Sequence, residues 1–196
     1  WFGGSETGDA VADVLFGKIT PSGKLTTTFP RSVGQLPLFY NHLNTGRPDP
    51  DSHIFNRYAS NYLDESNEPL YPFGYGLSYT DFVYGELQIS SETLPKNGEL
   101  TVSVTVTNKG NYDGYETVQL YLHDIYAEIA RPVKELKGFE RVFLKSGESR
   151  DVKFVITEDD LKFYNSELHY VYEPGEFDVM VGPNSRDVQT KSFQAK

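Results

Sequence analysis

The sequence contains no cysteine among its 196 residues, which excludes disulfide bonds and thiolate metal sites. The absence leaves the cellular compartment open, because oxidising compartments permit disulfides without requiring them. Basic residues are also scarce, since 18 lysines and arginines stand against 28 acidic residues and the net charge is −10. A chain of this charge repels a phosphate backbone, so we expect no nucleic-acid partner.

Long apolar runs are absent as well. No stretch approaches the roughly 18 residues that a membrane span needs, and no basic amphipathic helix stands out, so we expect no membrane partner. The sequence opens WFGGSETG, without an initiator methionine or the charged start of a signal peptide. We therefore expect it to begin inside a larger protein, with one complete domain and part of another.

Residues 5–17 carry the pattern of one short helix. Candidate caps at Ser5 and Thr7 precede apolar residues at helical spacing, and Gly17 ends the pattern. The LTTTFP run that begins at Leu25 alternates as a strand does. One helix and one strand cannot bury a core alone, so this segment must dock on further structure or on the rest of the chain.

A long connection follows, rich in polar residues and prolines, up to about residue 72. Disordered segments are poor in aromatic residues, whereas this one has many, so we expect much of it to be held against a surface. The aromatic residues in question are Phe39, Tyr40, Phe55, Tyr58, Tyr62 and Tyr71. We call residues 41–80 the strap.

From residue 81 onwards the hydrophobic pattern has a period of two, as in half-buried strands. The alternation is clearest in four runs, at Leu100–Val106, Val118–Leu122, Val152–Ile156 and Phe177–Val181. Turn signals separate the runs, and the spacing predicts an antiparallel β-sandwich of about seven strands over residues 81–196. Thr157 and Asp160 have capping-box spacing and predict a single helical turn.

Three further motifs in the sequence are explained better without a chemical role. The Gly-x-Gly pair at Gly74 and Gly76 lacks the third glycine of a dinucleotide loop, and close backbone packing explains it better. Asp49 and Asp51 form an incomplete calcium motif, and solvated loop charge explains them better. The four histidines, which include His53, have no metal-ligand spacing, so we expect neither a metal nor another cofactor.

Glu6 is the one carboxylate whose setting invites a catalytic interpretation, because it lies in a glycine-rich turn at a helix start. The helix dipole there stabilises the ionised form, which suits a capping residue better than a general acid. Glycosidases need two opposed carboxyl groups, and no second candidate has comparable placement. We therefore assign no catalytic residue to this sequence.

The strap has the composition of a sugar-contacting surface, in which rings stack on pyranose faces and amides bind hydroxyls. Packing between domains explains the same rings and is the preferred interpretation, although one loop can do both. The residues that we note as weak candidates for a substrate rim are Asn41, His42, Asn44, Arg47 and Tyr58.

Five stretches of the sequence resemble glycoside hydrolase family 3. WFGGSETGDAVADVLFGKITPSGKLTTTFP resembles the end of the family's α/β-sandwich domain, and PLYPFGYGLSYTDF resembles the entry to its fibronectin type III-like domain. VTVTNKGNYDGYETVQLYLHD, RPVKELKGFERVFLKSGES and YEPGEFDVMVG resemble signature stretches of that second domain. The resemblance spans almost the whole chain and is strongest to periplasmic β-glucosidases, which implies a periplasmic or secreted protein.

The resemblance implies a mainly β fold: an immunoglobulin-like or fibronectin type III-like sandwich over residues 81–196, the strap before it, and a remnant of an α/β-sandwich domain over residues 1–40. It also implies a retaining, exo-acting β-glucosidase that cleaves terminal β-D-glucosyl residues. The family's Asp nucleophile and Glu acid/base would both precede Trp1, and Glu6 does not match the acid/base motif.

The expected role is therefore that of a non-catalytic part that supports the catalytic domains of the same polypeptide, whose substrate would be a β-glucoside or oligosaccharide. One alternative is a stand-alone module that binds carbohydrate or protein, and a second is a purely structural spacer. A free module should expose a contiguous aromatic platform on one sheet, whereas the aromatic residues here are densest in the strap. A homodimer is left open.

Overall fold

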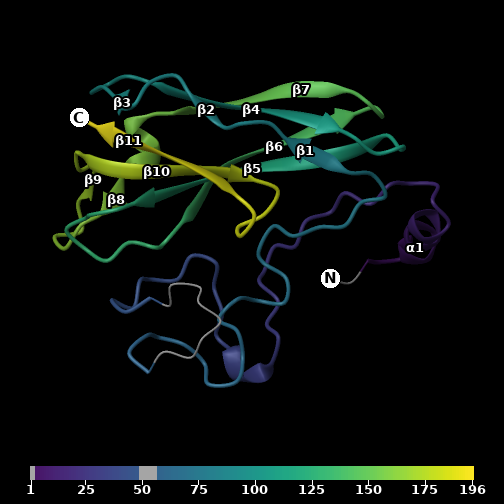
Figure 1. The fold of residues 1–196 in the computed structure, drawn as a ribbon, viewed down its shortest axis with the longest axis horizontal. Coiled ribbons are helices and arrows are strands. Elements are labelled where there is room, and N and C mark those ends of the chain that lie inside the picture. Colours follow the sequence, from purple (N-terminus) through teal and green to yellow (C-terminus); the bar gives the residue numbers. More distant parts are fainter. Residues whose placement is uncertain (1–2, 49–56) are drawn as a thin grey trace.

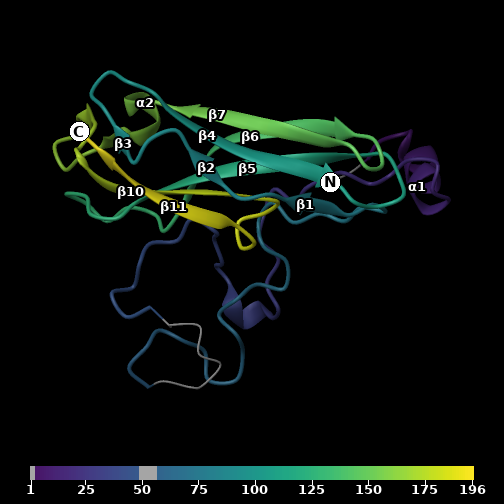
Figure 2. The ribbon, with the colours of Figure 1, turned by 45° about the horizontal axis from the view of Figure 1, so that its top comes forward.

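The computed structural model describes residues 3–48 and 57–196 and shows two β-sheets packed face to face, with the earlier residues lying to one side (Figure 1). The strap extends as a loop below the sandwich, and the N-terminal helix lies at one end of the sandwich (Figure 2). The predicted antiparallel sandwich is confirmed.

The first sheet is built around one long central strand. Its members are β1 (Phe82–Tyr84), β2 (Gln88–Ile89), β4 (Leu100–Asn108) and β7 (Ser149–Ile156). Strand β7 pairs with β4 along nearly its whole length, and β1 and β2 both pair with β4 as well. The two short strands therefore lie end to end along the other edge of β4.

The second sheet has the order β3-β11-β10-β5-β6. Its members are β3 (Thr93–Leu94), β5 (Gly114–Asp124), β6 (Glu135–Leu144), β10 (Gly175–Gly182) and β11 (Gln189–Ala195). All pairings are antiparallel except that of β3 with β11, which is parallel. A two-stranded hairpin of β8 (Phe163–Tyr164) and β9 (Tyr170–Val171) lies apart from both sheets.

The hydrophobic core lies between the two sheets, because alternate residues of each strand point inward. Val104 on β4 and Leu120 on β5 are 3% and 2% exposed, whereas the neighbouring Thr105 is exposed. The predicted register of both strands is therefore confirmed. The sandwich also contains the predicted helical turn, α2 (Glu158–Leu161), where the Asp160 carboxylate accepts a 2.8 Å hydrogen bond from the backbone N–H of Thr157.

In the described residues before the sandwich there are two helices: α1 (Thr7–Leu15) and the 3-10 turn η1 (Val33–Gln35). The prediction of a helix within residues 5–17 is confirmed, but the expected caps are wrong. Glu6 occupies the N-cap position without a side-chain capping bond, and the Thr7 hydroxyl donates instead to the carbonyl of Gly4 at 2.7 Å.

The LTTTFP run does not form the predicted strand. Its residues pair with the strap at single points: the N–H of Leu25 donates to the carbonyl of Tyr75 at 2.8 Å, and that of Phe29 donates to Tyr71 at 2.9 Å. The alternating pattern suits a sheet, but among the described residues no continuous strand lies beside this run. The segment is extended without being part of a ladder.

Candidate functional site

The five predicted rim residues all lie in the exposed loop of the strap. Asn44 stabilises the loop itself, because its side-chain oxygen accepts a 3.1 Å hydrogen bond from the N–H of Gly46. The carbonyl of Arg47 accepts a bond from the N–H of Ser60 at 2.8 Å, which brings the Arg47 and Tyr58 segments side by side. His42 lines a cavity.

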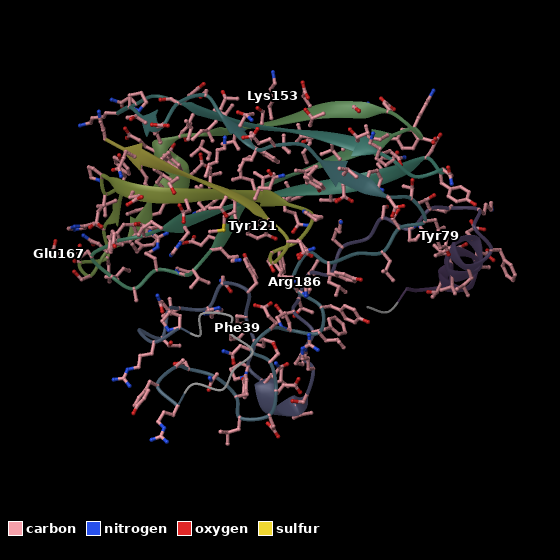
Figure 3. The ribbon with its side chains drawn as sticks, viewed as in Figure 1. Phe39, Tyr79, Tyr121, Lys153, Glu167 and Arg186 are labelled. Carbon is pink, nitrogen blue, oxygen red and sulfur yellow. The ribbon has the colours of Figure 1, made fainter. Side chains whose placement is uncertain are left out.

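That cavity, of about 270 Å³, lies between the strap and the sandwich. Its walls come from the LTTTFP run, the residues that lead into the strap, the residues on both sides of Tyr71, and two loops of the sandwich. The lining residues that present charged, aromatic or imidazole groups are Phe39, Tyr40, His42, Glu68, Lys134 and Arg186. Figure 3 labels Phe39 on the strap side and Arg186 on the sandwich side.

The two cationic groups at the cavity, Lys134 and Arg186, each have a hydrogen-bonding partner. Lys134 donates a 2.7 Å hydrogen bond to the carbonyl of Ser185, and burial lowers the pKa of this lysine although the negative charge of Glu68 opposes the shift. The guanidinium of Arg186 bonds the Asp187 carboxylate at 3.1 and 3.3 Å, which raises the pKa of Arg186 and lowers that of Asp187. The site is therefore a network of balanced charges.

The cavity sits beside an aromatic joint that fixes the strap to the sandwich. The ring of Tyr40 stacks on Phe73 with centroids 4.3 Å apart and meets the ring of Tyr121 edge-on at 5.8 Å. Tyr121 is fully buried on β5, and burial raises the pKa of its phenol. The expectation that aromatic residues hold this part of the chain against a surface is confirmed for Tyr40, which directly precedes the strap, whereas Tyr58 is 69% exposed.

Gly74 belongs to the same joint. Its φ is +80°, and a Cβ atom there would lie 2.0 Å from Oε1 of Gln119, whose side-chain amide donates to the Gly74 carbonyl at 3.2 Å. At Gly76 a Cβ atom would lie 2.6 Å from the carbonyl oxygen of Gly23. The Gly-x-Gly pair thus serves close backbone approach, as predicted.

A second joint is made of polar groups that lie far apart in the sequence. Glu116 on β5 has a side chain only 6% exposed, and it accepts a 3.1 Å bond from Lys24 and a 2.8 Å bond from the phenol of Tyr84. Burial and the charge of Glu116 raise the pKa of Tyr84. The sequence reasoning missed this joint, because no local pattern links Lys24 to a residue 92 positions later.

Glu6 is exposed at the start of α1. Asp49, Asp51, His53 and Phe55 lie outside the described residues. Within the described part of the chain no three potential ligands come together as a metal site, and no helix is long and apolar enough to cross a membrane.

The sequence matches two family models. Residues 1–79 match the C-terminal domain of glycosyl hydrolase family 3, and residues 116–185 match the fibronectin type III-like domain. The two matches follow each other in the order that the sequence resemblance implied.

Similar proteins point the same way. The chain is 52% identical over 195 residues to a periplasmic beta-glucosidase of Salmonella typhimurium, covering 99% of the chain and 25% of that relative. It is 44% identical over 198 residues to a beta-xylosidase of Formosa agariphila, covering all of the chain and 26% of that relative. The chain therefore spans about a quarter of the length of these curated relatives.

Among solved structures, the beta-glucosidase from Listeria innocua in complex with glucose superposes on the whole chain with a TM-score of 0.91 at 47% identity. The chain covers 27% of that structure. The sandwich and the segment before it thus have the same arrangement in a solved enzyme.

Proposed function

Because the chain belongs to glycoside hydrolase family 3 through its C-terminal domain and its fibronectin type III-like domain, we propose that it is a non-catalytic part of a retaining, exo-acting β-glucosidase. The nucleophile and the acid/base would lie upstream of Trp1, and the substrate would be a β-glucoside or oligosaccharide. The chain would support the catalytic domains of the same polypeptide.

One observation carries this proposal: the apolar side chains around α1 are uncovered while the sandwich core is closed. Val11 and Leu15 are 50% and 72% exposed, and Phe16, just after the helix, is 88% exposed. Exposed apolar side chains that gather in one place mark a contact surface. In the proposed enzyme, the rest of the α/β-sandwich domain covers these residues.

The proposal divides the chain into a remnant of the α/β-sandwich domain over residues 1–40, the strap over residues 41–80 and the sandwich over residues 81–196. The joints at Glu116 and Tyr121 support a structural role for the sandwich, because they fix the residues before it to one of its sheets. The strap would then approach the substrate, with its exposed residues at the rim. These residues are Asn41, His42, Asn44, Arg47 and Tyr58.

The proposed location is the periplasm or the exterior of the cell, which the name of the Salmonella relative supports. The sugar is proposed to be glucose. Relatives named for xylosides share 44% identity with the chain, so an enzyme assay should compare both sugars.

A chimera tests the proposal. The matching quarter of the Salmonella beta-glucosidase is replaced by this chain, and hydrolysis of aryl β-glucosides and aryl β-xylosides is compared with that of the intact relative and of a version that lacks the quarter. We expect the chimera to be active on the glucoside and the shortened version to be inactive. A folded but inactive chimera would contradict the supporting role and favour a stand-alone binding module.

A further inference from the structure

The cavity between the strap and the sandwich has walls that are fixed before any ligand arrives. The N–H of Val133 donates to the carbonyl of His42 at 2.9 Å, and the N–H of Ser185 donates to the carbonyl of Phe73 at 2.9 Å. The backbone N–H of Leu136 donates to the hydroxyl of Tyr40 at 3.3 Å. A site held in this way loses little conformational entropy on binding.

The size of the cavity limits the ligand to a small molecule. Ligand pockets in proteins range upward from about 300 Å³, and this one has about 270 Å³. It therefore suits a single ring better than a polymer segment.

Its charges select for a neutral ligand. Two cations, Lys134 and Arg186, are matched by two carboxylates, Glu68 and Asp187, of which Asp187 is bonded directly to Arg186. The negative charge of Glu68 acts to raise the pKa of both Lys134 and Arg186. Neither an anion nor a cation would gain from such a balanced set.

The cavity nevertheless offers hydrogen-bonding capacity. The Glu68 carboxylate makes no hydrogen bond to any described residue, so it can accept bonds from ligand hydroxyls. Lys134 uses one of its three N–H donors on Ser185. His42 approaches the carbonyl of Leu43 through Nδ1, which leaves Nε2 for a ligand.

An exposed aromatic ring completes the lining. Phe39 is 61% exposed although it directly precedes the packed ring of Tyr40. A phenyl ring beside hydroxyl-binding groups suits a ligand with an apolar face and a polar edge. Pyranose rings have both.

From this combination we propose that the cavity lined by Phe39, His42, Glu68, Lys134 and Arg186 binds one neutral pyranose ring. The C–H face of the sugar packs on Phe39, and its hydroxyls bond Glu68, Lys134 and Nε2 of His42. The choice of a β-glucoside as the probe rests on the proposed function, whereas the site itself belongs to this chain.

The isolated 196-residue chain provides the test. Methyl β-D-glucopyranoside is titrated into the ¹⁵N-labelled chain while backbone amide shifts are recorded. We expect saturable shifts centred on residues 39–42, 67–69, Lys134 and Arg186, with a dissociation constant on the order of millimolar. Glucuronate, as a charged pyranose, and glycerol, as a polyol without a ring, should both bind at least about tenfold more weakly.

Two variants and a matched control decide the outcome. Phe39→Ala removes the ring, and Glu68→Gln keeps the shape while removing the charge; each should weaken binding about tenfold. Tyr164→Ala removes an equally exposed aromatic residue on the β8–β9 hairpin and should leave binding unchanged. Each variant is first checked for the dispersed amide spectrum of the folded chain.

Absence of saturable shifts in the folded chain would overturn the proposal, as would affinities of Glu68→Gln and Phe39→Ala equal to that of the unaltered chain. Preferred binding of glucuronate would show an anion site and would also overturn it. The chimera assay reports separately on the proposed function. A chain that binds the glucoside but yields an inactive chimera would keep this site and remove the supporting role, and the converse would remove only the site.

Discussion

The phenol of Tyr84 donates a 2.8 Å hydrogen bond to the same carboxylate oxygen of Glu116 that accepts a bond from Lys24 at 3.1 Å. Tyr84 and Glu116 belong to the two different sheets of the sandwich, and Lys24 belongs to the segment before it. Three parts of the chain are therefore fastened at one buried oxygen atom. Such a carboxylate stabilises the fold only while its partners are present.

Lys24→Met should destabilise the chain, because it leaves the charge of Glu116 buried without its cation. We expect the free energy of unfolding to fall by about 3 kcal/mol in denaturant titrations. Lys18→Met is the matched control, since Lys18 forms an exposed pair with Asp13 and should cost less than about 0.5 kcal/mol. Equal losses in both variants would show that burial does not set the strength of the joint.

Truncation of Val104 or Leu120 to alanine should cost on the order of 2 to 4 kcal/mol each, because both side chains lie in the core and would leave cavities. Thr105→Ala removes an exposed side chain whose hydroxyl bonds Asp151, and it should cost less than about 1 kcal/mol. Denaturant melts give the ranking. A larger loss for Thr105→Ala would mean that β4 is out of register by one residue.

Hydrogen exchange should find the amides of α1 opening before those of β4 and β5. None of the nine described residues of α1 is buried, so in this chain the helix depends on little besides its own backbone bonds. Amides from Val11 to Leu15 should exchange first, and those of Val104 and Leu120 last. Equal protection would indicate that α1 is covered in solution, for example by a second copy of the chain.

The chain by itself should hydrolyse no glycoside. Retaining chemistry needs two carboxyl groups about 5 Å apart on opposite sides of the bond, and we propose that the family's pair lies upstream of Trp1. The assay uses purified chain and an aryl β-glucoside, with Glu6→Gln as the control for contamination. Turnover that disappears in Glu6→Gln would make Glu6 the acid and end the non-catalytic interpretation.

The stability of the chain should decline in mild acid, in part because of His123. Burial lowers the pKa of His123 below 6.5, although Asp178 and Asp124 oppose the shift. Below pH 6.5 the imidazole of His123 becomes protonated in the unfolded chain, whereas in the folded chain it stays neutral. The free energy of unfolding therefore falls as the pH drops toward the lowered pKa of the folded state. His123→Gln should flatten the curve of stability against pH in this range, as measured by denaturant melts between pH 7 and pH 5. Parallel curves would exclude His123 as a contributor.

The parts of the fold that could be predicted are those whose cause is local. The alternation in β4 follows from one buried face, and the turn at α2 follows from Thr157 and Asp160, three residues apart. The LTTTFP run shows the limit, because an alternating pattern states a preference for a sheet and does not supply the neighbouring strand.

The candidate site could be predicted only in outline. Composition indicated that the strap carries sugar-binding residue types, and His42 does line the cavity. Lys134 and Arg186 come from loops of the sandwich more than 50 residues after the strap, and only the topology brings them to it. Their contribution, like the bond between Lys24 and Glu116, depends on long-range packing that leaves no periodic trace in a sequence.

The parallel pairing of β3 with β11 has a consequence for the order of events during protein synthesis. Strand β3 is among the first parts of the sandwich to leave the ribosome, yet its partner is the last strand to be made. Until β11 emerges, the backbone groups of β3 and the free edge of β10 both lack the strand that separates them. Such open edges invite pairing with other chains. The interval before β11 is released is therefore when the nascent protein most needs protection from aggregation.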